Sequence, residues 1–256
     1  MSPYVTGRNA ALEALKAGSR ARKVLIEASP SLPPSLEPIV DAARSAGVPV
    51  DRVPAAQLSA IHPRHQGVAV EVGEFRYASF ADVGSAVRQA GPRALVLALD
   101  QVQDPQNLGT LLRTALAFQV TAVMLPAHRG AGVTPAVSRS SAGAVEHLAI
   151  CQVPNLGRAL QELKELGVWV MGLEAHGGVP IDEADLRGPI ALVVGSEGAG
   201  LGRLLAERCD LLIHLPMPGP VESLNAAVAG SIALYEVFRR RLWPVRIRGT
   251  RKGPSL

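Results

Sequence analysis

The sequence contains few of the residues that build disulfide-rich, metal-binding or membrane-spanning proteins. Its two cysteines, Cys151 and Cys209, are too few for a disulfide framework and lack the spacing of a metal site. No apolar run approaches the roughly 18 residues of a membrane span, and no signal-peptide pattern opens the chain. We therefore expect a cytoplasmic protein that holds no metal and contacts no membrane.

Acidic residues are absent from the C-terminal end, and the net charge of +4 arises there. The last basic residues follow one another without an acid: Arg239, Arg240, Arg241, Arg246, Arg248, Arg251 and Lys252. The other residues comprise 19 bases and 22 acids, so the rest of the chain has a net charge of −3. A basic tail suits a nucleic acid partner, although a solvated tail without a partner explains the charge nearly as well.

The length of 256 residues and the hydrophobic content of 48% suffice for one or two domains with buried cores. Short helical and extended patterns alternate over residues 1–76, which predicts a small α/β domain. We expect its helices at residues 9–17, 35–46 and 55–61, and its strands at 23–28, 48–53 and 67–72. The loop at residues 62–67 carries two histidines and an arginine, and it is either a solvated turn or an RNA contact.

Residues 77–93 are expected to form a linker with a helix at 80–90. From residue 94, apolar runs alternate with helical patterns, which predicts an α/β domain with a mostly parallel sheet over 94–242 and a basic tail at 243–256. The expected strands lie at residues 94–100, 122–125, 148–152, 168–173, 190–194 and 211–215. The expected helices lie within 101–120 and at 135–142, 156–166 and 223–241.

Three stretches of this second domain carry polar side chains where strands end, which is where parallel sheets form ligand sites. In the first, Asn107 lies at a helix start, where it is a candidate helix cap, and Arg113 follows six residues later. The second is an apolar run that ends in a glycine-rich loop holding Glu197. That loop also fits a tight turn or a mononucleotide site, but it lacks the lysine of a P-loop.

The third stretch, residues 216–230, begins with prolines that stop a strand and continues into a long helix. We expect Ser223 to cap this helix. Ser223 and Asn225 are candidates for holding a small polar cofactor at the helix start, whereas the alanines that follow are expected to serve close packing.

In their order and spacing, the three stretches resemble the three motifs of the SpoU, or TrmH-like, RNA ribose 2′-O-methyltransferases of the SPOUT superfamily. The matching residues are Asn107, Gly109, Arg113 and Thr114 in the first stretch, Gly195, Glu197 and Gly198 in the second, and Pro216, Ser223, Leu224, Asn225 and Ala229 in the third. Residues 4–75 resemble the ribosomal-protein-like RNA-binding domain of the subgroup that modifies 23S rRNA. Within the family, the sequence is most similar to the RlmB-type guanosine methyltransferases.

The resemblance implies a C-terminal trefoil knot, which is an exception to the usual rule against knotted chains. It also implies S-adenosylmethionine bound in the knot, and a homodimer packed partly through the last helix, with each site completed by the partner. Backbone groups are expected to hold the cofactor at Leu125, Gly195, Leu215, Met217 and Leu224.

The resemblance assigns catalysis to Arg113, Asn107, Glu197, Ser223 and Asn225. Arg113 is expected to activate the ribose hydroxyl, Asn107 and Glu197 to orient Arg113 or the ribose, and Ser223 and Asn225 to hold the knot loop and the cofactor pocket. The expected reaction is S-adenosylmethionine-dependent 2′-O-methylation of a guanosine ribose in 23S rRNA. The alternatives are methylation of tRNA or of another rRNA nucleotide, a non-catalytic RNA-binding or ribosome-assembly factor, and a nucleotide-utilising enzyme. RNA contacts are expected from the small domain, the loop at residues 128–139 and the basic tail.

Overall fold

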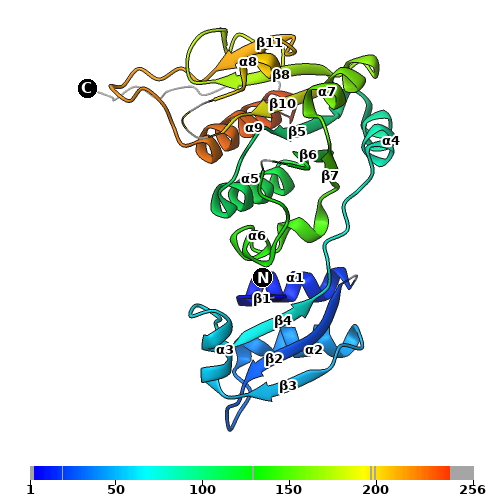
Figure 1. Ribbon diagram of the computed structural model, residues 1–256, viewed down its shortest axis with the longest axis vertical. Coiled ribbons are helices and arrows are strands. Elements are labelled where there is room, and N and C mark those ends of the chain that lie inside the picture. The colour runs from blue at the N-terminus through cyan, green and yellow to red at the C-terminus, as the bar shows by residue number, and fades with distance from the viewer. Residues whose placement is uncertain (1–2, 19, 129, 197, 199, 243–256) are drawn as a thin grey trace, which may run out of the picture.

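The computed structural model describes residues 3–242, except residues 19, 129, 197 and 199. Glu197 and the predicted tail at 243–256 therefore lie outside the described residues. The strands form two separate sheets, stacked along the long axis of the molecule (Figure 1). In the part of the chain that the structure describes, no helix is long and apolar enough to cross a membrane.

The first sheet belongs to residues 4–72, which we call the N-terminal unit. Its strands are β1 (Tyr4–Thr6), β2 (Ala21–Glu27), β3 (Val50–Val53) and β4 (Val68–Val72), in the order β1-β4-β2-β3. Its helices are α1 (Arg8–Ala17), α2 (Glu37–Ser45) and α3 (Ala55–Ile61). Side chains of β2 alternate between the two faces: Val24 and Ile26 pack with α1 and α2, and Leu25 packs with α3. The three predicted helices and three predicted strands are present, and the short edge strand β1 is an addition.

The second sheet is the parallel sheet predicted for the rest of the chain, which we call the C-terminal unit. Its strands are β5 (Leu95–Leu99), β6 (Ala122–Pro126), β7 (Ile150–Val153), β8 (Trp169–Glu174), β9 (Val179–Pro180), β10 (Ile190–Val194) and β11 (Leu211–His214). Their order is β7-β6-β5-β10-β8-β11-β9, and each pairing between described strands is parallel. The chain therefore places β10 between β5 and β8, which both precede it in sequence.

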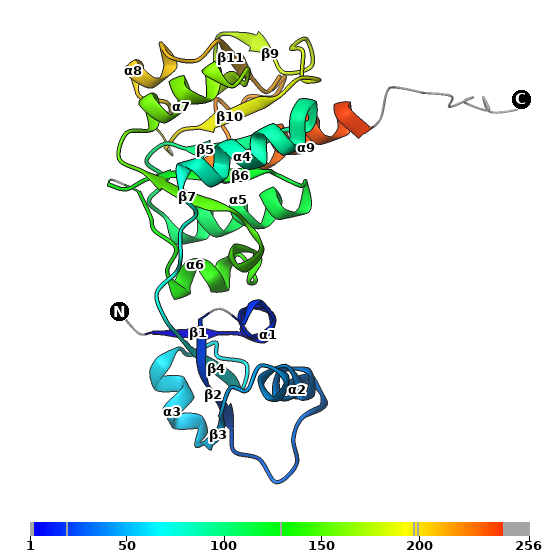
Figure 2. The same ribbon diagram turned by 90° about the vertical axis from the view of Figure 1, so that its right-hand side faces the viewer.

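Helices cover both faces of this sheet. One face carries α4 (Phe80–Ala90) and α7 (Leu156–Glu165), which lie toward the viewer in Figure 2, and α5 (Pro105–Ala117) and α9 (Ala226–Leu242) lie behind the sheet. Central strand β5 shows why: Leu95, Leu97 and Leu99 pack with α5 and α9, while Val96 and Ala98 pack with α4 and α7. A strand buried on both faces needs the unbroken apolar run that its sequence has.

A buried ion pair joins the two units. Arg20, which precedes β2, forms a salt bridge with Glu146, and their side chains are 6% and 2% exposed. The Arg20 guanidinium also donates to Ser138 Oγ at 2.8 Å and lies 5.4 Å from the centroid of the Phe75 ring. Because isolated buried charges are costly, these contacts fix how the units sit on each other.

Helix α6 (Pro135–Ser140) contacts β1 and α1 (Figure 1), and the short 3-10 turn at Ala144–His147 also contacts α1. Two further side-chain contacts cross the same boundary. Arg139 Nη1 on α6 lies 3.4 Å from Thr6 Oγ1, and His147 Nε2 lies 2.7 Å from Glu13 Oε2. The boundary is therefore held at several points along α1 and β1.

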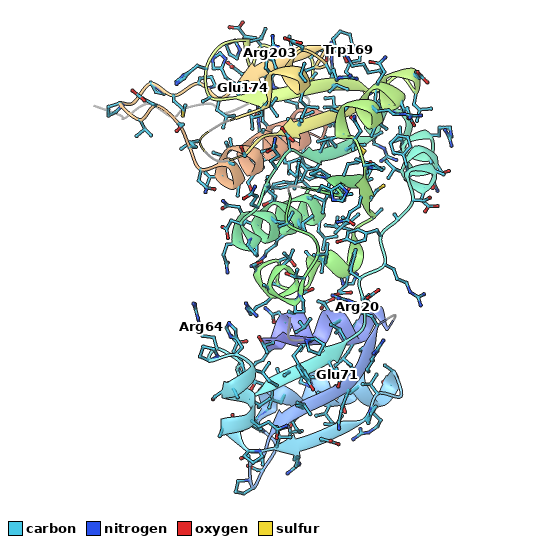
Figure 3. All side chains as sticks on the ribbon, viewed as in Figure 1. Arg20, Arg64, Glu71, Trp169, Glu174 and Arg203 are labelled. Atoms are coloured by element: carbon cyan, nitrogen blue, oxygen red, sulfur yellow. The ribbon has the colours of Figure 1, made fainter. Side chains whose placement is uncertain are left out.

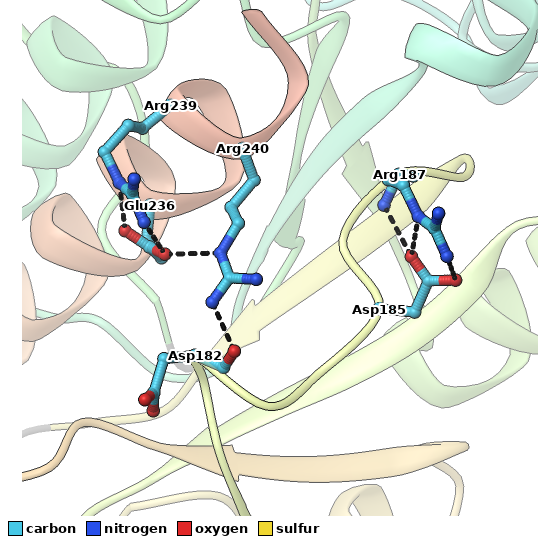
Figure 4. A network of polar contacts seen from close by, with 6 residues as sticks. All are labelled: Asp182, Asp185, Arg187, Glu236, Arg239 and Arg240. Carbon is cyan, nitrogen blue, oxygen red and sulfur yellow. Dashed lines mark hydrogen bonds and ion pairs between the residues drawn. The ribbon is translucent and has the colours of Figure 1, made fainter. Parts of the chain in front are cut away.

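The first three arginines of the predicted basic run belong to the fold. Arg239 and Arg240 on α9 form ion pairs with Glu236, and Arg240 also donates to the backbone carbonyl of Asp182 (Figure 4). Arg241 donates to the carbonyl oxygens of Arg93, Ala94, Leu186 and Gly188, and burial lowers the pKa of its guanidinium to about 10. Three of the seven bases of the C-terminal run are therefore held by contacts of the last turn of α9, and the predicted tail at 243–256 lies outside the described residues.

Candidate active site

A cavity opens at the carboxyl ends of β8, β10 and β11. Its volume is about 640 Å³ including the space open to solvent. The lining comes from the end of β8, the loop after β10, the segment after β11 and the first turn of α9. This is the edge at which parallel α/β sheets bind ligands.

Four of the five predicted cofactor residues line this cavity: Gly195, Leu215, Met217 and Leu224. Ser223, predicted as a catalytic residue, lines it too. The fifth, Leu125, does not: it is 2% exposed on β6 and packs in the core, with β5 between its strand and β10. A backbone contact between Leu125 and the cofactor stays a prediction from the family resemblance.

The loop after β10 is closed by its own backbone. Ser196 N and Gly200 N each donate to the other residue's carbonyl oxygen at 3.1 Å. A Cβ at Gly195 would lie 2.2 Å from the carbonyl carbon and oxygen of Gly200, so no side chain fits there. Gly198 and Gly200 have φ values of 84° and 64°, which favour glycine. The glycines thus let the backbone itself form one wall of the cavity.

Glu174 is a lining residue that the sequence analysis missed. It ends β8, and its Oε1 accepts a hydrogen bond from Leu201 N at 3.2 Å, which ties β8 to the glycine-rich loop (Figure 3). It is the one charged residue among the described lining residues. The sequence did indicate Glu174, because it directly follows the strand predicted at 168–173 and parallel sheets form ligand sites where strands end.

Helix α5 is capped by Asp104, not by Asn107. The Asp104 carboxylate accepts from Gln106 N and Asn107 N at 3.2 Å each. Asn107 lies within the first turn, so its side chain is directed to another partner. The cap prediction chose the wrong residue because two capping side chains, Asp104 and Asn107, stand within one turn of each other.

Helix α9 begins at Ala226, three residues later than predicted, and Asn225 caps it in place of Ser223. Asn225 Oδ1 accepts from Ala227 N at 2.9 Å and from Val228 N at 3.2 Å. Its Nδ2 donates to Asn107 Oδ1 at 3.2 Å. The two predicted asparagines are therefore brought together beside the cavity, and Asn225 links the start of α9 to the start of α5.

Arg113 lies on α5, and its side chain is exposed to solvent. Its neighbour Thr114 faces α9, with 2.9 Å between Thr114 Oγ1 and Ser231 Oγ. The structure does not place Arg113 in the cavity of its own chain. Glu197, in the glycine-rich loop, lies outside the described residues. No group of described side chains could hold a metal ion.

The cavity suits a flat, partly apolar ligand with polar ends. Leucine, methionine and alanine side chains supply apolar walls, and the closed glycine-rich loop lets a ligand approach backbone N–H and C=O groups. Glu174 and Ser223 add side-chain polar groups. S-adenosylmethionine, with an adenine ring, a ribose and a charged amino acid end, fits this set of residues.

Family models match nearly the whole chain. The SpoU rRNA Methylase family matches residues 94–235, and the domain described as RNA 2′-O ribose methyltransferase substrate binding matches residues 4–78. These two ranges correspond to the C-terminal and N-terminal units.

Bacterial proteins that are named as RNA methyltransferases align with 93% of this chain. The chain is 42% identical over 242 residues to the 23S rRNA (guanosine-2′-O-)-methyltransferase RlmB of Xanthomonas campestris, covering 93% of this chain and 97% of that protein. It is 39% identical over 239 residues to an uncharacterized tRNA/rRNA methyltransferase of Mycolicibacterium vanbaalenii, covering 93% and 76%.

Solved structures agree. The SpoU methyltransferase AviRb of Streptomyces viridochromogenes, in complex with AdoMet, has the same fold, with a TM-score of 0.78, 24% identity and coverage of 93% and 90%. The AdoMet-bound rRNA methyltransferase of Sinorhizobium meliloti is 28% identical, with a TM-score of 0.73 and coverage of 94% and 87%. The cavity, the two matched domains and these relatives together identify the chain as a member of the SpoU family of S-adenosylmethionine-dependent RNA 2′-O-ribose methyltransferases.

Proposed function

We propose that this enzyme methylates the 2′-hydroxyl of a guanosine ribose in cytoplasmic 23S rRNA. The observation that carries the proposal is the full-length similarity to the RlmB of Xanthomonas campestris, which is named for that reaction. The match of residues 4–78 to a substrate-binding domain supports an extended RNA substrate. Methylation of tRNA or of another rRNA nucleotide is the second candidate, favoured by the similarity to a protein named only as a tRNA/rRNA methyltransferase.

The cofactor would be held mainly by backbone groups of the loop after β10 and of the segment at residues 215–224, within a C-terminal trefoil knot. S-adenosylmethionine supplies an electrophilic methyl group. Because transfer is a displacement at that methyl, the residues around the cavity contribute chiefly by positioning. Asn225 and Asn107 would fix the start of α9 against α5, and Ser223 and Glu174 would offer polar contacts to the cofactor. By the resemblance to the family motif, Glu197 would orient Arg113 or the ribose.

A homodimer would place Arg113 where it can act. Helix α9 carries exposed apolar side chains at Val228, Ile232 and Tyr235, which are 46%, 43% and 47% exposed and share one helix face. Leu116, one turn after Arg113 on α5, is 37% exposed. Apolar side chains at this spacing suit a packed interface. A second copy seated there would bring Arg113 toward the partner's cavity.

Arg113 would lower the pKa of the ribose hydroxyl without removing its proton itself. A guanidinium hardly deprotonates in proteins, so it is a poor general base. It binds a phosphate in a bidentate geometry, and a fixed positive charge beside a hydroxyl favours the ionised form. Its role is therefore to hold the phosphate next to the target ribose and to stabilise the developing oxyanion.

The test compares Arg113→Ala with Arg158→Ala, a matched exposed arginine on α7 that pairs with Glu162. Arg113→Ala is expected to reduce methylation of 23S rRNA by roughly 100- to 1,000-fold, as for removal of one charge-stabilising group, with S-adenosylmethionine affinity unchanged by calorimetry. Arg158→Ala should keep both. Wild-type methylation rates in Arg113→Ala would remove this residue from the mechanism. Ribose-methylation mapping of 23S rRNA from cells with and without the gene identifies the nucleotide, and an unchanged map would contradict the proposed substrate.

A further inference from the structure

A second cavity lies between the two units, on the side of the boundary marked by Arg64 in Figure 3, with Arg20 on the other side. Its volume is about 810 Å³ including the space open to solvent. The N-terminal unit contributes Thr6 and the loop at residues 62–66, and the C-terminal unit contributes Gln106 and Arg139. We call this cavity the interdomain cleft.

The interdomain cleft gathers positive charge that no carboxylate balances. None of the ion pairs between described residues includes Arg64 or Arg139. Burial lowers the pKa of the Arg139 guanidinium, and the charge of Arg64 lowers it further. An anion bound between the two guanidinium groups would offset the repulsion between their like charges.

His62 adds a neutral donor to the same cleft. Its Nδ1 accepts a hydrogen bond from Arg64 N at 3.0 Å, so the neutral ring carries its proton on Nε2 and donates from there. Burial lowers the pKa of His62, and the nearby charges of Arg139, Arg64 and His65 add to this effect. The ring is therefore neutral near pH 7 and offers one N–H.

The geometry of the cleft is set before any ligand arrives. Arg139 Nη1 lies 3.4 Å from Thr6 Oγ1, which holds the guanidinium against β1. The buried Arg20–Glu146 pair fixes the same boundary from its other side. A site assembled from both units in this way loses little entropy on binding, because its donors are already placed.

We propose that the interdomain cleft binds a backbone phosphate of the substrate RNA, with Arg64 and Arg139 as charged donors and His62 as a neutral donor. This inference rests on the proposed function, since it assigns the ligand as the enzyme's own substrate. Position favours RNA over a free anion: Gln106 lines the cleft, and the next residue, Asn107, bonds Asn225 beside the cofactor cavity. An RNA strand that crosses the start of α5 would contact both sites.

The test measures RNA affinity and its salt dependence for the full-length enzyme, using an unmodified 23S rRNA transcript. Arg64→Ala and the double variant Arg64→Ala/Arg139→Ala are compared with Arg44→Ala, which removes one exposed charge from α2 of the same unit. We expect roughly tenfold weaker RNA binding for Arg64→Ala and a further loss in the double variant. The slope of log K against log salt should fall by about 0.7 per arginine on a single strand. Arg44→Ala should bind as the wild type does.

Calorimetry with S-adenosylmethionine alone separates this inference from the proposed function. All variants should keep wild-type cofactor affinity, because the cofactor cavity shares no lining residue with the cleft. If the wild type methylates the transcript but Arg64→Ala and the double variant keep its RNA affinity and salt slope, the cleft is not a phosphate site. If Arg64→Ala and the double variant bind inorganic phosphate more weakly than the wild type but bind RNA equally well, the cleft binds a free anion instead. If the wild type neither binds the cofactor nor methylates RNA, the proposed function itself fails.

Discussion

The cofactor cavity and the interdomain cleft lie on either side of the first turn of α5, yet they are built in opposite ways. The cavity has apolar walls, a wall of glycine backbone and one charged residue, Glu174, among its described lining residues. The cleft has two arginines and a histidine brought together from two units. A small ligand is held by shape and a few polar groups, whereas a polyanion is held by charge.

This contrast predicts that mutations on the two sides separate cofactor binding from RNA binding. Changes that distort the loop after β10 should weaken the cofactor and spare RNA. Changes that loosen the boundary between the units should do the reverse. Three substitutions, ordered by expected size, test that separation, and a fourth tests an ion pair outside both sites.

The largest effect is expected from Arg20→Ala, which leaves Glu146 as an unpaired buried charge. Breaking a buried pair costs about 3–5 kcal/mol, so the free energy of unfolding should drop by that amount in urea titrations. RNA affinity should fall as well, because the cleft loses its fixed geometry. Arg158→Ala, which breaks an exposed pair, should cost no more than about 1 kcal/mol. A loss of cofactor affinity equal to the loss of RNA affinity in Arg20→Ala would contradict the separation.

Gly195→Ala should damage the opposite side. The new methyl group would overlap the Gly200 backbone at 2.2 Å, and overpacking of this kind costs about 1–3 kcal/mol. We expect S-adenosylmethionine to bind about 10- to 100-fold more weakly in calorimetry, with RNA affinity unchanged. The matched control is Gly188→Ala, whose added methyl group would meet no atom within 4 Å. Equal cofactor affinity in both variants would show that the loop accommodates the added methyl group without weakening cofactor binding.

Asn225 offers a finer separation, because its two amide atoms have different partners. Asn225→Ala removes the cap of α9 and should cost about 1 kcal/mol of stability in thermal unfolding. Asn225→Asp keeps the capping oxygen but replaces the donor to Asn107 with an acceptor. It should therefore retain stability and still lose methylation activity. Full activity in Asn225→Asp would show that the contact with Asn107 has no part in the reaction.

The smallest effect concerns Glu236, which contributes to neither site. Hydrogen bonds from Arg239, opposed by burial and joined by one from Arg240, lower the pKa of its carboxyl below 4.5. A carboxyl whose pKa is lower in the folded than in the unfolded state stabilises the fold at pH values above its unfolded-state pKa. This contribution is lost as the pH falls through the folded-state pKa. The melting temperature of Glu236→Gln should thus lie below that of the wild type at pH 7, and the two should converge below pH 4.5. A gap that persists at low pH would refute the linkage.

The parallel sheet and most of the cofactor cavity could be predicted from the sequence because both depend on local patterns. Apolar runs such as residues 190–194 define buried strands, and the rule that sites form at strand ends then places a site at the glycine-rich loop. The resemblance to the family adds Gly195 and Leu215 as cofactor contacts, and both line the cavity. The order of the strands could not be predicted in this way, because it depends on long-range pairing that a run of residues does not encode.

The residues that cap the helices and those that form the interdomain cleft could not be predicted from the sequence, for related reasons. Asp104 and Asn107, or Ser223 and Asn225, are all acceptable caps, and tertiary contacts decide which is used. The cleft joins Arg64 and Arg139, which are 75 positions apart. The loops at residues 62–67 and 128–139 were each candidate RNA contacts, but their meeting in one cleft depends on how the two units pack, which local patterns do not encode.

The position of β10 affects how the protein can be made on the ribosome. Strands β5 and β8 leave the ribosome before it, yet they are joined to each other only through β10. Nascent chains that end before residue 190 therefore hold two unpaired apolar edges in the middle of an incomplete sheet, which are templates for association with other chains. The N-terminal unit has its whole sheet by residue 72 and can fold first. The N-terminal unit thus folds early, and the insertion of β10 between β5 and β8 comes late. Any need for a chaperone should be greatest between these two steps.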